Sequence, residues 1–123
     1  MAAELKVLGT RLHNKVAIVT GGGSGFGESI CKRFAEEGCK VVVADFDPVG
    51  GQRVASYHTS NMHFINMDVS KEGDWEAVIE NTLAKFGRLD ILVNNAGTSY
   101  KNKVCFLTPS IWRKKANEIC SPA

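Results

Sequence analysis

Short, continuous apolar runs alternate along the chain with longer segments in which apolar residues recur every three or four positions. The apolar runs cover residues 15–20, 40–45, 62–67 and 89–93. Since such runs are apolar on both faces of a strand, they predict strands buried inside a parallel sheet. The segments with helical spacing cover residues 28–37, 49–58 and 71–86, and they predict amphipathic helices between the strands.

The clearest predicted helix covers residues 71–86. It would bury one apolar face against the sheet, because residues three and four positions apart share a face of a helix. Ser70 is the expected N-cap and Gly87 the expected C-terminal stop, since Gly tolerates the left-handed conformation that ends many helices. The residues of the apolar face are Trp75, Val78, Ile79, Leu83 and Phe86.

The alternation of strands and helices predicts an α/β fold. A parallel sheet covered by helices on both faces and joined by right-handed crossovers gives a doubly wound sheet of the Rossmann type. The expected strand order is 3-2-1-4, with the sheet truncated after the fourth strand. A length of 123 residues suits one domain, and residues 1–123 are interpreted as a single, partial domain.

Composition narrows the classes of partner. Hydrophobic residues make up 44% and charged residues 23% of the chain, and a net charge of +2 without a basic stripe argues against nucleic acid. No apolar run reaches the ~18 residues of a membrane span, and the N-terminus lacks a secretion signal, so a cytoplasmic protein is expected. The four cysteines form no C-x-x-C pair and the three histidines are scattered, so we expect reduced thiols and no metal site.

Candidate chemistry begins at the turn from the first strand into the first helix, Thr20–Gly27. Its glycines, Gly21, Gly25 and Gly27, follow the order G-x-x-x-G-x-G. Glycine lets the backbone turn tightly and approach a pyrophosphate, and the first amides of the helix then face the negative charge. A tight turn without a ligand is the alternative.

An acid at the end of the second strand sharpens this prediction. Asp45 lies 18 residues beyond Gly27, where a carboxylate can accept hydrogen bonds from both hydroxyls of an adenosine ribose. A simple exposed acid is the alternative. The 2′-phosphate of NADP would be repelled by Asp45, and neither Ser24 nor Phe46 supplies a compensating cation, so NAD is favoured over NADP.

Four features in this order resemble the classical short-chain dehydrogenase/reductase family, in particular its branch related to 3-oxoacyl-acyl-carrier-protein reductases. They are the strand and glycine loop, Asp45, the pair Asp68-Val69 after the third strand, and Asn94-Asn-Ala-Gly97 after the fourth. The likeness runs from about Arg11 to Lys103. It implies an oxidoreductase that uses NAD or NADP on an alcohol/ketone pair.

The resemblance implies a cofactor role for each element. The glycine loop would bind the phosphates, and Asp45 at the end of the second strand would bind the adenosine ribose. The residues after the third strand would contact the adenine. The turn after the fourth strand would contact the ribose beside the nicotinamide. Asn94 would mainly brace the central strands, although a polar strand cap is the simpler alternative for Asn94 and Asn95. The implied residues are Gly21, Ser24, Gly25, Phe26, Gly27, Asp45, Phe46, Asp68, Val69, Asn94, Asn95, Ala96 and Gly97.

The catalytic residues of the family are not matched. Its members use a Tyr as general acid/base, with a Lys four residues later that lowers the Tyr pKa from its ordinary value near ~10. The chain contains Tyr57 and Tyr100, and four residues beyond them stand Asn61 and Val104. We therefore predict no catalytic residue in this chain.

The last segment, residues 104–123, is predicted to be a divergent tail. Leu107–Trp112 looks like the start of the family's next helix, but the Asn expected seven residues after that Trp is replaced by Ile119. The Ser, Tyr and Lys of the family would lie beyond this segment. The chain is thus interpreted as a truncated form that mainly binds the cofactor.

Two other functions stay open. The chain could be a non-catalytic nucleotide-binding or interaction module that pairs with a full-length relative or with itself. Without a fifth strand, Ile91–Val93 would form an open apolar edge, which predicts marginal stability or association. A methyltransferase that uses S-adenosylmethionine shares the glycine turn and the acid, but it does not call for Asn94–Gly97. The substrate is not predicted.

Overall fold

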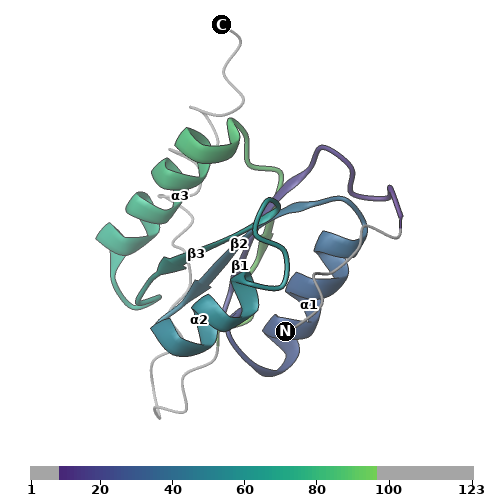
Figure 1. The fold of residues 1–123 in the computed structure, drawn as a ribbon. Coiled ribbons are helices and arrows are strands. Elements are labelled where there is room, and N and C mark those ends of the chain that lie inside the picture. Colours follow the sequence, from purple (N-terminus) through teal and green to yellow (C-terminus); the bar gives the residue numbers. More distant parts are fainter. Residues whose placement is uncertain (1–8, 97–123) are drawn as a thin grey trace, which may run out of the picture.

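The computed structural model describes residues 9–96, which form a parallel sheet with helices on both faces (Figure 1). Its strands lie in the order β3-β2-β1-β4, and all pair in parallel, which confirms the predicted order and the α/β fold. The elements are β1 (Val16–Thr20), α1 (Gly25–Glu36), β2 (Lys40–Asp45), α2 (Pro48–Ala55), β3 (Met62–Asn66), α3 (Glu72–Phe86) and β4 (Ile91–Val93).

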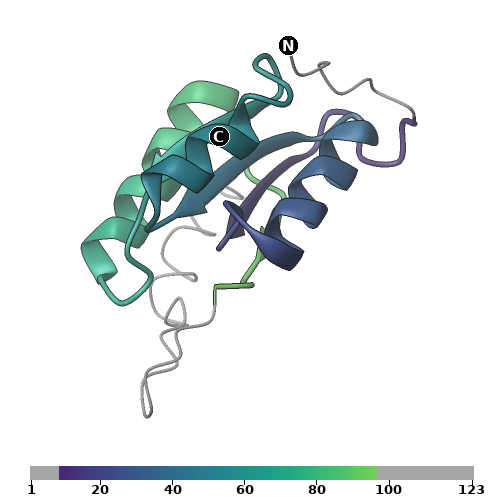
Figure 2. The same cartoon turned by 60° about the horizontal axis from the view of Figure 1, so that its bottom comes forward.

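The sheet separates two apolar cores, which explains why its central strands are apolar on both faces. Ala17 and Val19 of β1 pack toward α1 and α2, whereas Ile18, between them, packs toward α3. Each fully buried Val or Ile contributes about 1.5–3 kcal/mol through the hydrophobic effect. Figure 1 shows the green α3 on one side of the sheet and α1 and α2 on the other, and Figure 2 shows the blue α1 and the green α3 on opposite sides of the strands in a second view.

The predicted apolar face of α3 is confirmed, but its predicted start is wrong. Trp75, Val78 and Ile79 are buried against the sheet, and Gly87 ends the helix in the left-handed conformation at φ 79°. The N-cap is Lys71 rather than Ser70. The hydroxyl of Ser70 instead donates to the carboxylate of Asp68, which follows β3, so it does not cap the helix.

The other boundaries differ from the prediction by a few residues. Helix α1 begins within the glycine loop, three positions before the predicted Glu28, and α2 ends at Ala55 rather than near His58. Strand β4 begins at Ile91, two residues after the predicted Leu89. The preceding Asp90 is also bound to β1, because its amide donates to the Val16 carbonyl at 2.9 Å and its carboxylate accepts from the Val16 amide at 2.9 Å.

Two of the cysteines lie in the core, as expected of structural thiols. Cys31 and Cys39 are free and buried, and burial raises the pKa of each thiol to about 12. They therefore stay protonated and unreactive at neutral pH.

Some predictions fall outside the described residues. These concern Gly97, the tail of residues 104–123 and the helix-like segment Leu107–Trp112. Within residues 9–96, no helix is both long enough and apolar enough to cross a bilayer. In the same region β4 pairs with β1 alone, and its three residues are half-buried.

Candidate functional site

The predicted site residues gather at one edge of the sheet. Because all four strands are parallel, their carboxyl ends meet there, and this is the edge at which open α/β sheets bind ligands. The glycine loop leaves β1, Asp45 ends β2, and the turn that begins at Asn94 leaves β4. Asp68 follows β3, so it lies farthest from β4 across the sheet.

The glycine loop needs glycine for two physical reasons. Gly21 and Gly25 have φ of 65° and 57°, in the left-handed region that side chains disfavour. Gly27 has an ordinary φ but no space, because a Cβ there would overlap the carbonyl oxygen of Gly21. The motif therefore sets the loop's shape, including the close contact between the start of α1 and the end of β1.

The N-terminus of α1 is left without a side-chain cap. Its N-cap is Ser24, whose side chain makes no capping hydrogen bond, and the amides of the first helical turn have no partner within a helix. Ser24, Gly25 and Phe26 are exposed at this end. Free amides and the positive end of the helix dipole make this position suitable for an anion.

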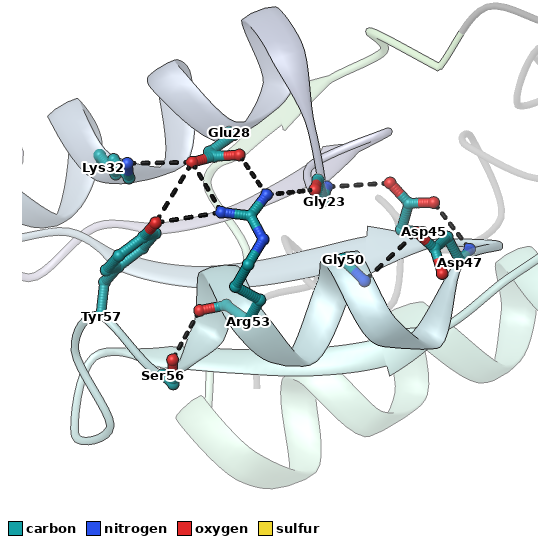
Figure 3. Close-up of polar contacts among 9 residues, drawn as sticks. All are labelled: Gly23, Glu28, Lys32, Asp45, Asp47, Gly50, Arg53, Ser56 and Tyr57. Atoms are coloured by element: carbon teal, nitrogen blue, oxygen red, sulfur yellow. Dashed lines mark hydrogen bonds and ion pairs between the residues drawn. The ribbon is translucent and has the colours of Figure 1, made fainter. Parts of the chain in front are cut away.

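Asp45 is turned toward the glycine loop. Its Oδ2 accepts a hydrogen bond from the Gly23 amide at 2.9 Å and its Oδ1 accepts one from the Asp47 amide at 2.8 Å (Figure 3). The carboxylate is thus held by one amide on each oxygen. Since an ionised carboxylate has about four acceptor positions, it retains capacity to bind further hydroxyl groups.

Large apolar side chains are exposed beside the loop and the end of β2. Phe26 is 84% exposed, Phe46 is 72% exposed and Val49 is 77% exposed. Phe26 and Phe46 were expected at the site from the sequence, while Val49 was not. Exposed apolar residues cost solubility, and their position flanking the carboxylate and the free amides offers flat surface to an aromatic ligand.

The turn after β3 is fixed by its own polar groups. The Oδ1 atom of Asp68 accepts from the Ser70 hydroxyl at 2.6 Å and from the Ser70 amide at 2.9 Å, and these bonds hold the pKa of Asp68 below its ordinary value. The Asp68 amide donates to Asp74, and the carbonyl of Val69 accepts from the Trp75 indole at 2.9 Å. The carboxylate of Asp68 is therefore ionised and oriented.

The ends of β1 and β4 are joined by a residue that the sequence analysis did not single out. Thr20 is fully buried, and its hydroxyl oxygen accepts from the amides of Asn95 and Ala96, both at 3.0 Å. The Asn95 side chain donates to the Gly21 carbonyl at 3.4 Å, and the Thr20 hydroxyl donates to Oδ1 of the exposed Asn94 at 3.4 Å. Thr20 and Asn94 therefore connect the ends of β1 and β4 together. The sequence signal for Thr20 was a hydroxyl residue directly before the first glycine.

A polar cluster between α1 and α2 was also missed. The Arg53 guanidinium donates to the two carboxylate oxygens of Glu28 at 2.6 and 3.1 Å, and to the Gly23 carbonyl at 3.2 Å. The same Glu28 carboxylate pairs with Lys32 at 2.9 Å. Hydrogen bonds from Arg53 and Lys32 lower the pKa of Glu28 from its ordinary 4.5 to about 2. The cluster touches the loop, as Figure 3 shows.

Comparison with known proteins assigns this architecture to a family. The family model described as "short chain dehydrogenase" matches residues 15–117. The chain belongs to the short-chain dehydrogenase family. This membership confirms the likeness seen in the glycine loop and the Asn-Asn-Ala-Gly turn, and the matched region includes all the strands and helices described above.

Individual relatives within the short-chain dehydrogenase family are similar at a substantial level. The chain is 42% identical over 107 residues to secoisolariciresinol dehydrogenase from Forsythia intermedia and 48% identical over 87 residues to tropinone reductase-like 1 from Erythroxylum coca. Among solved structures, a 3-ketoacyl-(acyl-carrier-protein) reductase from Brucella melitensis, complexed with NADH, shares 44% identity with a TM-score of 0.70.

The chain covers only part of these short-chain dehydrogenases. The two aligned regions are 84% and 71% of this chain but 39% and 32% of those two relatives. The structural match covers 85% of this chain and 44% of the reductase. The chain therefore spans less than half of the length of each of these three relatives.

Proposed function

We propose that this chain binds a nicotinamide dinucleotide, NAD in preference to NADP, as the cofactor-binding part of an oxidoreductase for an alcohol/ketone pair. One observation carries the proposal: the uncapped N-terminus of α1 lies beside the oriented carboxylate of Asp45. Phosphates need free amides and a ribose needs an acceptor, and this edge offers the two together.

The residues at the edge fit the successive parts of the ligand. Gly21, Ser24, Gly25, Phe26 and Gly27 would hold the pyrophosphate, and Asp45 would accept from the ribose hydroxyls with Phe46 beside it. Asp68 and Val69 would face the adenine. The ribose next to the nicotinamide would be contacted by Asn95, Ala96 and Gly97. The bound cofactor would supply hydride chemistry, while these residues bind and orient it.

The preference for NAD rests on charge. A 2′-phosphate would face the Asp45 carboxylate, and the neighbouring Ser24 and Phe46 are uncharged. The cation that α2 contributes, Arg53, is already paired with Glu28. A phosphate at this position would therefore meet repulsion without a free counter-charge from α2.

We further propose that the 123-residue chain binds the cofactor without turning over a substrate. Neither of its tyrosines, Tyr57 and Tyr100, is followed four residues later by a lysine. An isolated phenol titrates near ~10 and is a poor general base at neutral pH.

Titration of the folded chain tests this function. We expect NADH to bind at least about tenfold more tightly than NADPH, a difference of about 1.4 kcal/mol, as measured by calorimetry. S-adenosylmethionine serves as a control ligand and should not compete. A folded chain that fails to bind NADH would contradict the proposal, and reduction of ketones by the purified chain would contradict its non-catalytic part.

A further inference from the structure

The backbone of Gly23 is held on both sides of its Cα. Its carbonyl accepts a hydrogen bond from Nη2 of Arg53 at 3.2 Å, and its amide donates to Oδ2 of Asp45 at 2.9 Å (Figure 3). The two bonds lie on the two successive peptide units that meet at Gly23. The orientation of the Asp45 carboxylate and the position of the Arg53 guanidinium are thus connected through the backbone of a single residue of the glycine loop.

The position of Arg53 is set by Glu28. Two of the guanidinium nitrogens donate to the Glu28 carboxylate, and Nη1 also donates to the Tyr57 hydroxyl at 3.0 Å. Two parallel hydrogen bonds of this kind fix the plane of a guanidinium, which a single contact does not. Glu28 lies in the first turn of α1, so the pair joins that helix to α2 across the loop.

The backbone around Gly23 leaves no space for it to move toward α2. A Cβ at Gly23 would lie 2.8 Å from the Gly51 nitrogen, and a Cβ at Gly50 would lie 2.7 Å from the Gly23 oxygen. The Asp47 side chain accepts from the Gly50 amide at 3.2 Å, and the Asp47 amide donates to Asp45. These contacts form a closed path from the loop through Asp45 to α2.

We propose that Glu28 and Arg53 are a positioning pair that fixes the backbone at Gly23 and, through it, the Asp45 carboxylate in the orientation that receives a ribose. The ribose part rests on the proposed function, whereas the effect on the Gly23 backbone does not. Glu28 keeps Arg53 in place over the whole neutral pH range, because it stays ionised.

A purely stabilising role would be expected to be weak. The side chains of Arg53 and Glu28 are 49% and 17% exposed, and ion pairs near solvent contribute little to stability. The same geometry acts directly on the loop, so we expect the pair to affect the binding of a nucleotide more than the stability of the fold.

The first experiment needs no nucleotide. Amide NMR spectra of the ligand-free chain are compared for Arg53→Gln, Glu28→Gln and a control, Arg33→Gln, whose side chain pairs with Glu36 and Glu37 away from the loop. We expect the Gly23 amide resonance to shift in the first two variants and to stay unchanged in the control. Unchanged Gly23 resonances in both Arg53→Gln and Glu28→Gln would overturn the proposal.

The second experiment follows the effect into binding. We expect Arg53→Gln and Glu28→Gln each to weaken NADH binding by about tenfold, with Arg53→Lys in between because one ammonium group keeps the charge but not the fork. In an Asp45→Ala background, Arg53→Gln should change the affinity by less than about twofold. Additive losses would overturn the coupling to Asp45.

The two experiments separate the two proposals. If the wild-type chain binds no NADH while the Gly23 resonance still responds to Arg53→Gln, the cofactor assignment fails and the positioning pair stands. Should Arg53→Gln not fold, as judged by its amide spectrum and melting curve, Glu28→Gln and Arg53→Lys decide the outcome alone.

Discussion

Helices α1 and α2 both begin at the edge formed by the carboxyl ends of the strands, but their first turns are built differently. Asp47 caps α2 by accepting from the amides of Val49 and Gly50, and Pro48 occupies a first-turn position that needs no amide. Helix α1 begins at Ser24 with no side-chain cap. The two ends lie next to each other, and they differ in whether a side chain caps the first turn.

The comparison shows where the molecule gives up local stability. An uncapped helix loses about 1 kcal/mol relative to a capped one, and each glycine inside a helix costs a similar amount relative to alanine. Helix α1 leaves its first amides free, while α2 contains Gly50 and Gly51 because they lie against the loop and the Phe64 ring. Helix α1 thus leaves backbone donors without a side-chain cap, and the glycines of α2 let its backbone lie close to the loop and to β3.

The largest expected effect comes from adding a methyl group at Gly27, where the start of α1 contacts the Gly21 carbonyl. Gly27→Ala should destabilise the fold by about 3 kcal/mol and abolish NADH binding, since the added Cβ would overlap the Gly21 carbonyl. Gly73→Ala in α3, where an added Cβ would meet nothing within 4 Å outside the helix's own nearby backbone, is the matched control and should be neutral or stabilising. Urea unfolding measures both, and equal effects in the two variants would contradict the prediction.

A smaller effect is expected from the caps themselves. Asp47→Ala should lower the free energy of unfolding by about 1 kcal/mol, whereas Asp47→Asn should retain most of the stability because Asn also caps helices well. Ser24→Ala should change the free energy of unfolding by no more than a few tenths of a kcal/mol, since its side chain makes no cap. A large loss in Ser24→Ala, measured by thermal unfolding, would remove the distinction between the two helices.

The smallest effect concerns pH. The pKa of Glu28 falls from 4.5 to about 2 on folding, chiefly through its hydrogen bond from Arg53. A lowered carboxyl pKa stabilises the fold above the unfolded pKa, and this contribution is lost as the pH falls from about 4.5 through about 2. The stability difference between wild type and Glu28→Gln should therefore be at most about 1 kcal/mol at pH 7 and disappear near pH 2. A difference independent of pH would show that the pair does not form.

The sequence predicted the parts of the fold that depend on local pattern. The apolar runs gave the strands and their order, and Asp45 and the glycine loop were placed at the correct edge because parallel strands end there together. The contacts between distant residues were beyond a single sequence. Thr20 meets Asn95 only through the pairing of β1 with β4, and Arg53 meets Glu28 only because α2 packs beside α1.

The Ser70 error has a different origin. Both Asp68 and Ser70 favour a local turn, and the sequence does not say which of them uses its side chain first. In the structure the carboxylate takes the hydroxyl and the amide of Ser70, and the helix starts one residue later. Caps are hard to assign wherever a candidate cap residue can hydrogen-bond to a neighbouring side chain instead of to the first amides of the helix.

The buried hydroxyl of Thr20 also sets an order of events during synthesis. It receives amides that lie 75 and 76 residues later in the chain. A nascent protein ending after β3 would already contain the loop and Asp45 but would lack the turn after β4 that the proposed function places beside the cofactor. Competence to retain a nucleotide should therefore arise abruptly, when β4 joins the sheet. In ribosome-stalled chains of increasing length, the fraction retained on immobilised NAD should rise in one step at the length that includes β4 and the turn after it.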